Sequence, residues 1–252
     1  MNVAPPVSCM CLTYGRPPQL LEEAIESFLR QDYQGEKELI VLNDLPQQKL
    51  RFEHLDVQII NVGKRFRTVG EKRNACAALC SHDVLFVWDD DDIYLPWRIS
   101  FSMEMMGRDL HFFKSARSFM LSNGIVTGPH RNLFHSSSCW NRSLFEEVHG
   151  YPPMGSGQDL EIERKFAHAL GLKRLASDIP LERIYYIYRW AGTESYHLSW
   201  YGKNNKSEDV VDYIFQRLES GEVPAGEIHL KPHWKVDYVA IVAQYLLSLI
   251  HI

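Results

Sequence analysis

The chain has 252 residues, of which 45% are hydrophobic and 23% charged, so it has a globular composition that excludes disordered, collagen-like and coiled-coil proteins. With 27 Lys and Arg against 32 Asp and Glu, the chain has a formal net charge of −5, which argues against a nucleic-acid partner. An odd number of cysteines, five, and a start without a secretory signal favour a cytoplasmic location, and no apolar run reaches the roughly 18 residues of a membrane span.

Apolar runs that alternate with helical segments dominate the first hundred residues. The expected strands are Val7–Leu12, Leu39–Leu42, Val57–Val62 and Val84–Trp88, and the expected helices follow Pro17-Pro18 and cover Val69–Cys80. This alternation predicts an α/β fold with a doubly wound, mainly parallel sheet and helices on both faces. Ligands bind at the carboxyl ends of such strands, where Asp44 and the run Asp89–Asp92 lie.

The second half of the chain has shorter and more polar elements. The expected strands are His111–Lys114, Ser118–Leu121, Ile125–Val126 and Arg183–Trp190. Asn123-Gly124 predicts a hairpin between the second and the third of these. The expected helices are Gln158–Leu170, which stops at Gly171, and one that runs from a Ser207 cap to about Gly221. Because no linker separates the two halves, we expect a single domain over residues 1–252.

Four consecutive acids, Asp89–Asp92, directly follow a buried strand. A carboxylate run at such a place is costly unless the charges are solvated, paired or bound to a metal. A hard divalent cation, Mg²⁺ or Mn²⁺, is commonly held by one or two carboxylates together with substrate phosphates. The simpler interpretations are a solvated loop, or Asp residues that cap a helix beginning at Pro96. An EF-hand is excluded because its Gly and its terminal Glu are missing.

The acid run is one of several motifs that stand in the order found in a known family. Asp89–Pro96 (DDDDIYLP) resembles the D-x-D-D-x-x-x-P segment of family 2 glycosyltransferases with the GT-A fold. The other matches are VSCMCLTYGR at Val7–Arg16, with Gly15 where Asn is usual, LIVLND at Leu39–Asp44, GEKRNA at Gly70–Ala75, and Gln158-Asp159 at the place of the family's E-D pair. The resemblance covers roughly residues 7–200. It implies an inverting enzyme that uses a nucleotide-sugar donor and a divalent metal.

The resemblance also implies roles for particular residues on the donor side. Asp44 would contact the nucleotide base, and Arg73 would lie beside the base or the diphosphate. Asp91 would be the principal metal ligand. The set expected to bind the nucleotide sugar is Thr13, Tyr14, Arg16, Asp44, Arg73, Asp89 and Asp90, and the set expected to bind the metal is Asp89, Asp91 and His197. Asp92 is expected at most to cap the next helix.

Asp159 is the residue expected to act as the catalytic base. It follows Gly-Ser-Gly and lies in the first turn of a helix, whose dipole favours the ionised carboxylate that accepts a proton. The preceding residue is Gln158 where the family has Glu. Glu161 and Glu163, deeper in the same helix, are the fallback bases.

The segment that ends in Arg189 and Trp190 resembles the family's C-terminal R-W region. Arg189 is expected to clamp phosphate or to pair with an acid, and Trp190 to stack on an acceptor sugar or to lie in the core. Together with Gln158 they are the candidate phosphate or acceptor contacts.

The resemblance divides the chain into a nucleotide-sugar-binding half at about residues 1–110, an acceptor and catalytic half with a small antiparallel region at about 111–200, and a helical extension over the rest. The donor would be of UDP or GDP type, and the acceptor a glycan, a lipid-linked molecule or a protein. We expect His233–Ile252 to form a helix docked on the domain, with a homodimer contact and a peripheral contact at the inner face of a membrane as alternatives.

Two other functions stay open. A catalytically idle nucleotide- or carbohydrate-binding module is compatible with Gln158. A metal-dependent phosphatase or nucleotidyltransferase could use the Asp cluster, although a phosphatase would carry its acids after the first strand rather than the fourth. In every case we expect an acidic site that needs its cation before it can hold a diphosphate.

Overall fold

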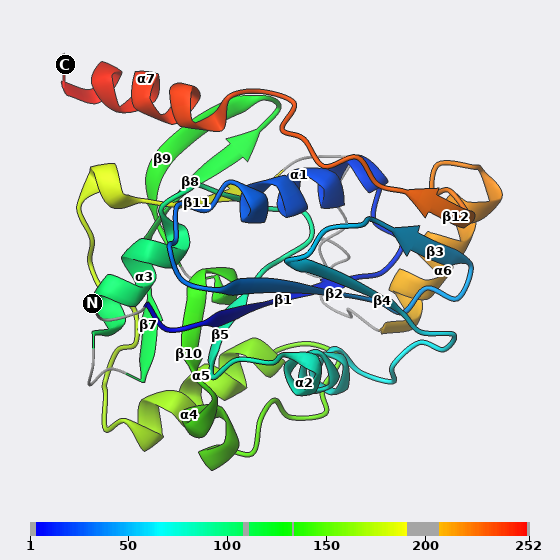
Figure 1. Cartoon of the computed structure of the whole chain (residues 1–252), viewed down its shortest axis with the longest axis horizontal. Helices are drawn as coiled ribbons and strands as arrows, with labels where there is room; N and C mark the ends of the chain where they lie inside the picture. The colour runs from blue at the N-terminus through cyan, green and yellow to red at the C-terminus, as the bar shows by residue number, and fades with distance from the viewer. Residues whose placement is uncertain (1–3, 108–110, 133, 191–206, 251–252) are drawn as a thin grey trace.

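A six-stranded sheet forms the centre of the computed structural model, which describes residues 4–107, 111–132, 134–190 and 207–250 (Figure 1). In spatial order its strands are β4 (Val57–Asn61), β2 (Lys37–Asn43), β1 (Val7–Thr13), β5 (Val84–Val87), β10 (Ser138–Asn141) and β7 (Phe112–Lys114). The first four pair in parallel, whereas β10 is antiparallel to both of its neighbours. The expectation of a mainly parallel sheet is therefore confirmed.

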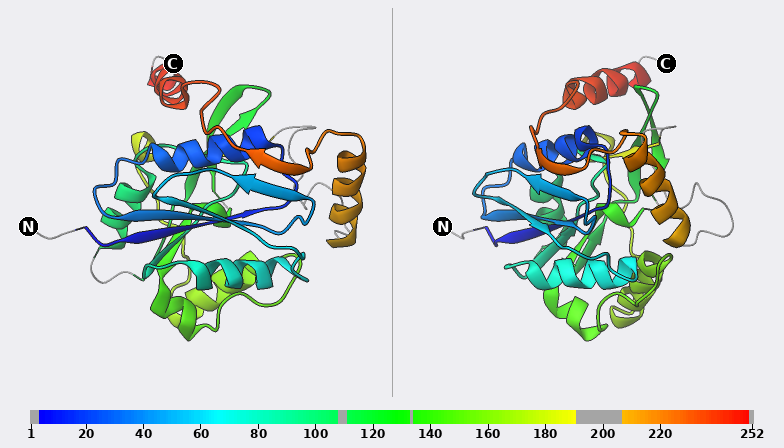
Figure 2. Two further views of the ribbon diagram at one scale, coloured as in Figure 1. Left: turned by 45° about the vertical axis from the view of Figure 1, so that its right-hand side comes forward. Right: turned by 90° about the vertical axis from the view of Figure 1, so that its right-hand side faces the viewer.

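Helices cover both faces of this sheet, as expected. Helix α1 (Pro18–Leu29) lies on one face, and α2 (Val69–Leu79), α4 (Arg142–Glu147) and α5 (Gln158–Ala169) lie on the other, as Figure 2 also shows. Alternation along β1 divides the core between them, because Cys9 and Cys11 pack with Phe28 of α1 while Met10 packs with Cys76 of α2. Each face therefore has its own apolar core.

A second sheet lies beside the first and has the order β6–β11–β8–β9. Its strands are β6 (Ile93–Tyr94), β11 (Tyr186–Arg189), β8 (Arg117–Ser122) and β9 (Ile125–Arg131). The Asn123-Gly124 hairpin is confirmed, with φ of 50° and 76° at its two residues. The expectation of an antiparallel region is wrong for one pair, since β11 and β8 are parallel. The chain reaches β11 only after α4 and α5, and such a long crossover allows a parallel pairing that a hairpin does not.

The remaining elements surround these sheets. They are β3 (Gln48–Arg51) and β12 (Gly226–His229), which pair in parallel, the helices α3 (Arg98–Met106), α6 (Ser207–Glu219) and α7 (Tyr238–Ile250), and the short 3₁₀ helices η1 (His135–Ser137) and η2 (Leu181–Arg183). Helix α3 begins at Arg98 and not at the expected Pro96. Helix α5 ends before Gly171, whose φ is +63°, as expected.

The C-terminal helix α7 docks on its own domain. Tyr238 and Val242 are buried in the core shared with α1, and the Tyr245 hydroxyl accepts a hydrogen bond from the Gly128 backbone N–H at 3.0 Å in β9. This is the first of the three expected placements. None of the described helices combines the length and the apolar character needed to cross a membrane.

Candidate active site

A cavity of about 510 Å³ lies at the carboxyl ends of β1, β2 and β5. The expected site residues that line it are Thr13, Tyr14, Arg16, Asp44, Arg73, Asp89, Asp90, Asp91, Gln158 and Asp159. The parallel register explains why residues that follow β1, β2 and β5 meet here, since the carboxyl ends of parallel neighbours share one edge. His197 lies outside the described residues.

Asp44, which directly follows β2, is held by a buried lysine. The Lys72 ammonium lies 2.5 Å from Asp44 Oδ1 and also donates to the Thr13 carbonyl oxygen at 2.7 Å, while the Phe66 N–H donates to Asp44 Oδ2 at 3.0 Å. Burial lowers the pKa of Lys72, and the charge and hydrogen bond of Asp44 offset this effect only in part. The GEKRNA motif pointed to Arg73, so the sequence analysis missed Lys72, its neighbour.

The four acids after β5 have different partners. Arg16 donates from Nε to Asp90 Oδ1 at 3.0 Å and places Nη2 3.2 Å from Asp91 Oδ2. Asp89 accepts a hydrogen bond from the Ser136 hydroxyl and lies 3.8 Å from Arg73 Nη2. Because Asp90 and Asp91 are less than 5% exposed, the solvated-loop interpretation is wrong.

Asp92 points away from the cavity into the second sheet. Its carboxylate accepts from the Tyr186 hydroxyl at 2.6 Å and from the Arg189 backbone N–H at 2.8 Å. Burial, followed by the charges of Asp91 and Asp89, raises the pKa of Asp92 well above its usual value. The expected helix cap is wrong, because Asp92 joins β6 to β11 instead.

Arg189 and Trp190 do not line the cavity. The Arg189 guanidinium donates to Glu23 Oε2 at 2.8 Å and to the Asp91 carbonyl oxygen at 2.7 Å. Of the two alternatives for this residue, the ion pair is therefore correct and the phosphate clamp is wrong. Trp190 is 41% exposed and its ring lies 6.1 Å from that of Tyr188, so a place in the core is wrong as well.

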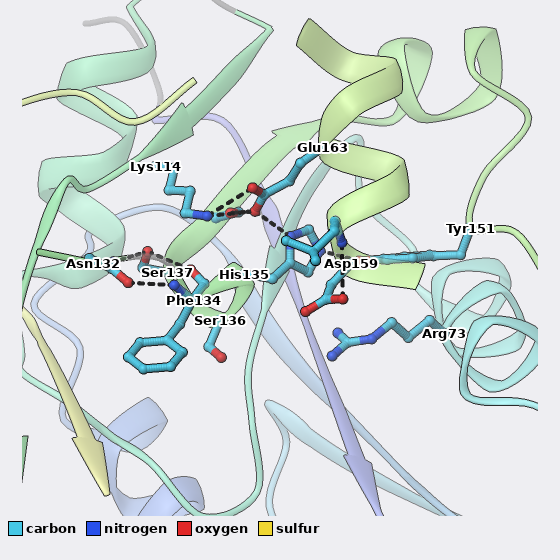
Figure 3. Close-up of polar contacts among 12 residues, drawn as sticks. Arg73, Lys114, Asn132, Phe134, His135, Ser136, Ser137, Tyr151, Asp159 and Glu163 are labelled. Atoms are coloured by element: carbon cyan, nitrogen blue, oxygen red, sulfur yellow. Dashed lines mark hydrogen bonds and ion pairs between the residues drawn. The ribbon is translucent and has the colours of Figure 1, made fainter. Parts of the chain in front are cut away.

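The amino end of α5 brings Gln158 and Asp159 to the cavity. Asp159 Oδ1 accepts from the Leu160 N–H at 2.9 Å, and the buried Gln158 has an Oε1 without a hydrogen-bond partner among the described residues. The fallback bases are engaged elsewhere, because Glu161 pairs with Arg164 and Glu163 pairs with Lys114. Asp159 is thus the α5 carboxylate that faces the cavity (Figure 3).

The segment around η1 contributes cavity residues that the sequence analysis did not predict (Figure 3). The Phe134 ring stacks on Tyr188 with 3.9 Å between centroids, and His135 and Ser136 follow it into the cavity wall. The buried Asn132 amide fixes this segment by donating to the Ser115 carbonyl oxygen at 2.9 Å. No motif marks these positions, although a His followed by three Ser before an apolar strand is an unusual polar run.

The cavity is balanced in charge rather than acidic. Among its described lining residues, five are acids (Asp44, Asp89, Asp90, Asp91 and Asp159) and five are bases (Arg16, Arg65, Arg67, Lys72 and Arg73). The expectation of an acidic site is therefore wrong, since the bases come from loops and from α2, which the acid motifs did not reveal. Arginine and lysine side chains are themselves phosphate ligands.

The donor set suits a hard cation with few protein ligands. Asp89 and Asp91 supply carboxylate oxygens, the ligand type that Mg²⁺ and Mn²⁺ prefer. Across residues 4–107, 111–132, 134–190 and 207–250, no cluster of three or more His, Cys, Asp or Glu is placed to hold a metal alone. A divalent cation here would take part of its coordination from substrate phosphates, as Mg²⁺ commonly does.

Residues 8–124 match the family model described as glycosyl transferase family 2. Among curated proteins, the chain is 30% identical over 173 residues to the uncharacterized glycosyltransferase YwdF of Bacillus subtilis (strain 168), an alignment that covers 64% of this chain and 59% of that protein. The chain thus spans about three fifths of the length of this relative.

Two solved structures share the fold at low sequence identity. TarS residues 1–349 of S. aureus, in complex with UDP-GlcNAc, has a TM-score of 0.55 and 15% identity, covering 95% of this chain and 71% of that one. The mannosyltransferase PcManGT from Pyrobaculum calidifontis, in complex with GDP-Man and Mn²⁺, has a TM-score of 0.55 and 15% identity, covering 88% of this chain and 68% of that one.

Proposed function

We propose that the chain, whose residues 8–124 match glycosyl transferase family 2, moves a sugar from a nucleotide-diphosphate donor to an acceptor hydroxyl, with inversion at the anomeric carbon. One observation carries the proposal: three of the acids after β5, namely Asp89 to Asp91, line one cavity together with Arg73 and Asp159. The structural neighbours in complex with UDP-GlcNAc and GDP-Man support a nucleotide-sugar donor.

On the donor side, the basic residues of the cavity bind and orient the diphosphate. Arg73 is the central group, because it lies 3.8 Å from Asp89 and lines the cavity together with the amino end of α5. Its planar guanidinium has paired N–H donors that can bind two phosphate oxygens. A divalent cation bound by Asp89 and Asp91 would supply further neutralisation of the negative charge on the leaving diphosphate. Asp44, directly after β2, and Lys72 of α2, which pairs with it, would contact the nucleoside.

On the acceptor side, Asp159 takes the proton. The acceptor oxygen forms the new bond to the anomeric carbon as the bond from that carbon to the diphosphate breaks, and the hydroxyl proton passes to the carboxylate. Asp159 Oδ1 accepts from the Leu160 N–H, which fixes the carboxylate and leaves Oδ2 to receive the proton. Attack from the face opposite the diphosphate inverts the configuration. General-base catalysis of this kind contributes roughly 10²- to 10⁴-fold to the rate.

The substitution Asp159→Asn tests the proposal. We expect it to lower kcat for transfer by roughly 10²- to 10⁴-fold while nucleotide affinity measured calorimetrically with Mn²⁺ stays unchanged, because Asn cannot accept the proton. Glu161→Gln is the control, since Glu161 lies in the same helix turn and pairs with Arg164 outside the cavity. Loss of metal-dependent nucleotide binding in Asp159→Asn would contradict the role as base.

A catalytically idle binding module is the second candidate, and Gln158 in place of the family's Glu is the observation that favours it. Turnover assays, run beside the same calorimetry, separate the two functions. Nucleotide binding with no turnover of UDP and GDP sugars on glycan, lipid-linked and protein acceptors would support the module. Turnover that depends on Asp159 would exclude it, and release of inorganic phosphate from simple phosphate esters would point to a phosphatase.

A further inference from the structure

We propose that a buried hydrogen-bonded chain, Lys114–Glu163–His135–Tyr151, positions Arg73 for the donor diphosphate. The inference rests on the proposed function for the role of Arg73, but the chain itself stands on the geometry. Its four members come from β7, α5, η1 and the loop before α5, and they converge behind the cavity wall (Figure 3).

The links of the chain are short and buried. Lys114 Nζ lies 2.8 and 2.9 Å from the two oxygens of Glu163, and Glu163 Oε1 lies 2.8 Å from His135 Nδ1. His135 Nε2 lies 2.7 Å from the Tyr151 hydroxyl. Lys114, His135 and Tyr151 are each less than 5% exposed and the Glu163 side chain is 15% exposed, so the protein shields most of these bonds from water.

Burial and charge favour one order of donors and acceptors along these contacts. Burial would raise the pKa of Glu163, but the hydrogen bonds from His135 and Lys114 and the charge of Lys114 lower it, so the carboxyl group is ionised. As an acceptor, its carboxylate requires the proton of His135 on Nδ1. Burial lowers the pKa of His135, against Glu163, which raises it, so Nε2 is an acceptor and the Tyr151 hydroxyl must donate to it.

This order directs the Tyr151 oxygen towards Arg73. Because the Tyr151 hydroxyl donates its hydrogen bond to His135, its oxygen can only accept further hydrogen bonds, and a guanidinium is a suitable donor. Burial raises the pKa of Tyr151, while the charge of the nearby Arg73 lowers it. The Arg73 guanidinium carbon lies over the Tyr151 ring, 5.4 Å from its centroid, so the ring that His135 holds in place orients the guanidinium. Arg73 is the point at which the chain acts on the cavity.

Stability alone gives no reason for such a chain. Burying Lys114 with Glu163 and a His carries a desolvation cost that apolar side chains of similar volume would avoid. A guanidinium that must pair with phosphate, by contrast, gains from being held in one orientation before the substrate arrives. Tyr151, His135 and Glu163 are therefore positioning residues, and none of them needs to touch the substrate.

The first test reads the tautomer directly and needs no activity. Two-dimensional ¹H–¹⁵N NMR of the imidazoles at pH 7, with His135→Gln to assign the signal, is expected to show a neutral ring protonated on Nδ1. Tyr151→Phe should shift the Nε2 resonance, because it removes the donor to that atom, whereas Tyr245→Phe should not. The hydroxyl of Tyr245, in α7, is also hydrogen-bonded, but its partner is Gly128 of β9 and it lies outside the cavity. Protonation on Nε2, or a charged ring, would overturn the proposal.

The second test is a double-mutant cycle between Tyr151 and Arg73. We expect Tyr151→Phe to lower kcat/KM about tenfold in the wild type and less than about twofold in the Arg73→Gln background, because the hydroxyl acts through that guanidinium. A merely structural role would give the same loss in both backgrounds, and that result would overturn the proposal.

Affinity for UDP or GDP with Mn²⁺, measured on the same four proteins, separates the two proposals. Binding without turnover would leave the cycle readable in affinity while the proposed transfer fails. If the wild type neither binds nor turns over nucleotide sugars, the proposed function has failed, and the tautomer measurement decides the chain by itself.

Discussion

Gly70, a single residue at the start of α2, lets the loop before α5 come close to the donor side of the cavity. Its N–H donates to the Met154 carbonyl oxygen at 3.1 Å, and a Cβ at this position would lie 1.8 Å from the Pro152 carbonyl oxygen. Since the obstacle is backbone, Gly70→Ala must push apart α2 and the loop that leads to Asp159. We expect a loss of about 2 kcal/mol in the free energy of unfolding and a loss of kcat. Urea denaturation and turnover measure the two effects.

Gly63→Ala is the matched control for this substitution. A Cβ at Gly63 would meet nothing within 4 Å, so its effect on the free energy of unfolding should stay within about 0.5 kcal/mol. If Gly70→Ala were as stable and as active as Gly63→Ala, the close approach of the loop to α2 would be refuted.

Local patterns revealed some site residues and left others hidden. Asp44 and Asp89 could be placed from the sequence because each directly follows an apolar run, and the end of a buried strand is a local feature. His135 and Tyr151 could not, because what marks them is contact with Glu163 and Arg73, far away in the chain. Lys72 is a similar case, since burial beside Asp44 depends on the packing of α2.

At the scale of elements, a buried carboxylate on α1 joins three parts of the fold. Glu23, which is fully buried, accepts from Arg189 of β11 at 2.8 Å and from the Tyr238 hydroxyl of α7 at 2.7 Å. Glu23→Gln leaves a buried guanidinium without its counter-charge. We expect it to lower the free energy of unfolding by about 3 kcal/mol, measured by urea denaturation.

Glu26→Gln on the same helix is the control for Glu23. Glu26 pairs with Arg30 at the surface, one turn along, and such pairs contribute only about 0.3–0.5 kcal/mol. Equal stabilities of Glu23→Gln and Glu26→Gln would show that the buried ion pair does not hold α1, β11 and α7 together.

The elements that the sequence revealed are those with a local periodicity. The four parallel strands and α5 were found from apolar runs and a terminal Gly. By contrast, β3 has one buried apolar residue, Leu50, in four, and it is a strand only because β12, far along the chain, pairs with it. The parallel pairing of β11 with β8 escaped for the same reason, since pairing partners distant in sequence leave no mark on either segment.

At the scale of the whole molecule, the buried chain behind the cavity makes stability depend on pH. Burial lowers the pKa of His135, so below its usual value of 6.5 the unfolded state binds a proton that the folded state does not. The pKa of Glu163 is lowered too, because the hydrogen bonds from His135 and Lys114 and the charge of Lys114 outweigh the effect of burial, and its contribution is lost as pH falls below about 4.5. Both groups therefore make stability rise with pH.

Urea denaturation between pH 7.5 and 5 measures this dependence. Each proton bound by the unfolded state alone contributes a slope of about 1.4 kcal/mol per pH unit, so the wild type should lose stability steadily as pH falls below about 6.5. His135→Gln should flatten that slope, because its side chain does not titrate, whereas His229→Gln, at an exposed position on β12, should keep it. A slope that is unchanged in His135→Gln would contradict a buried, neutral His135, and would place the acid sensitivity of the molecule in other groups.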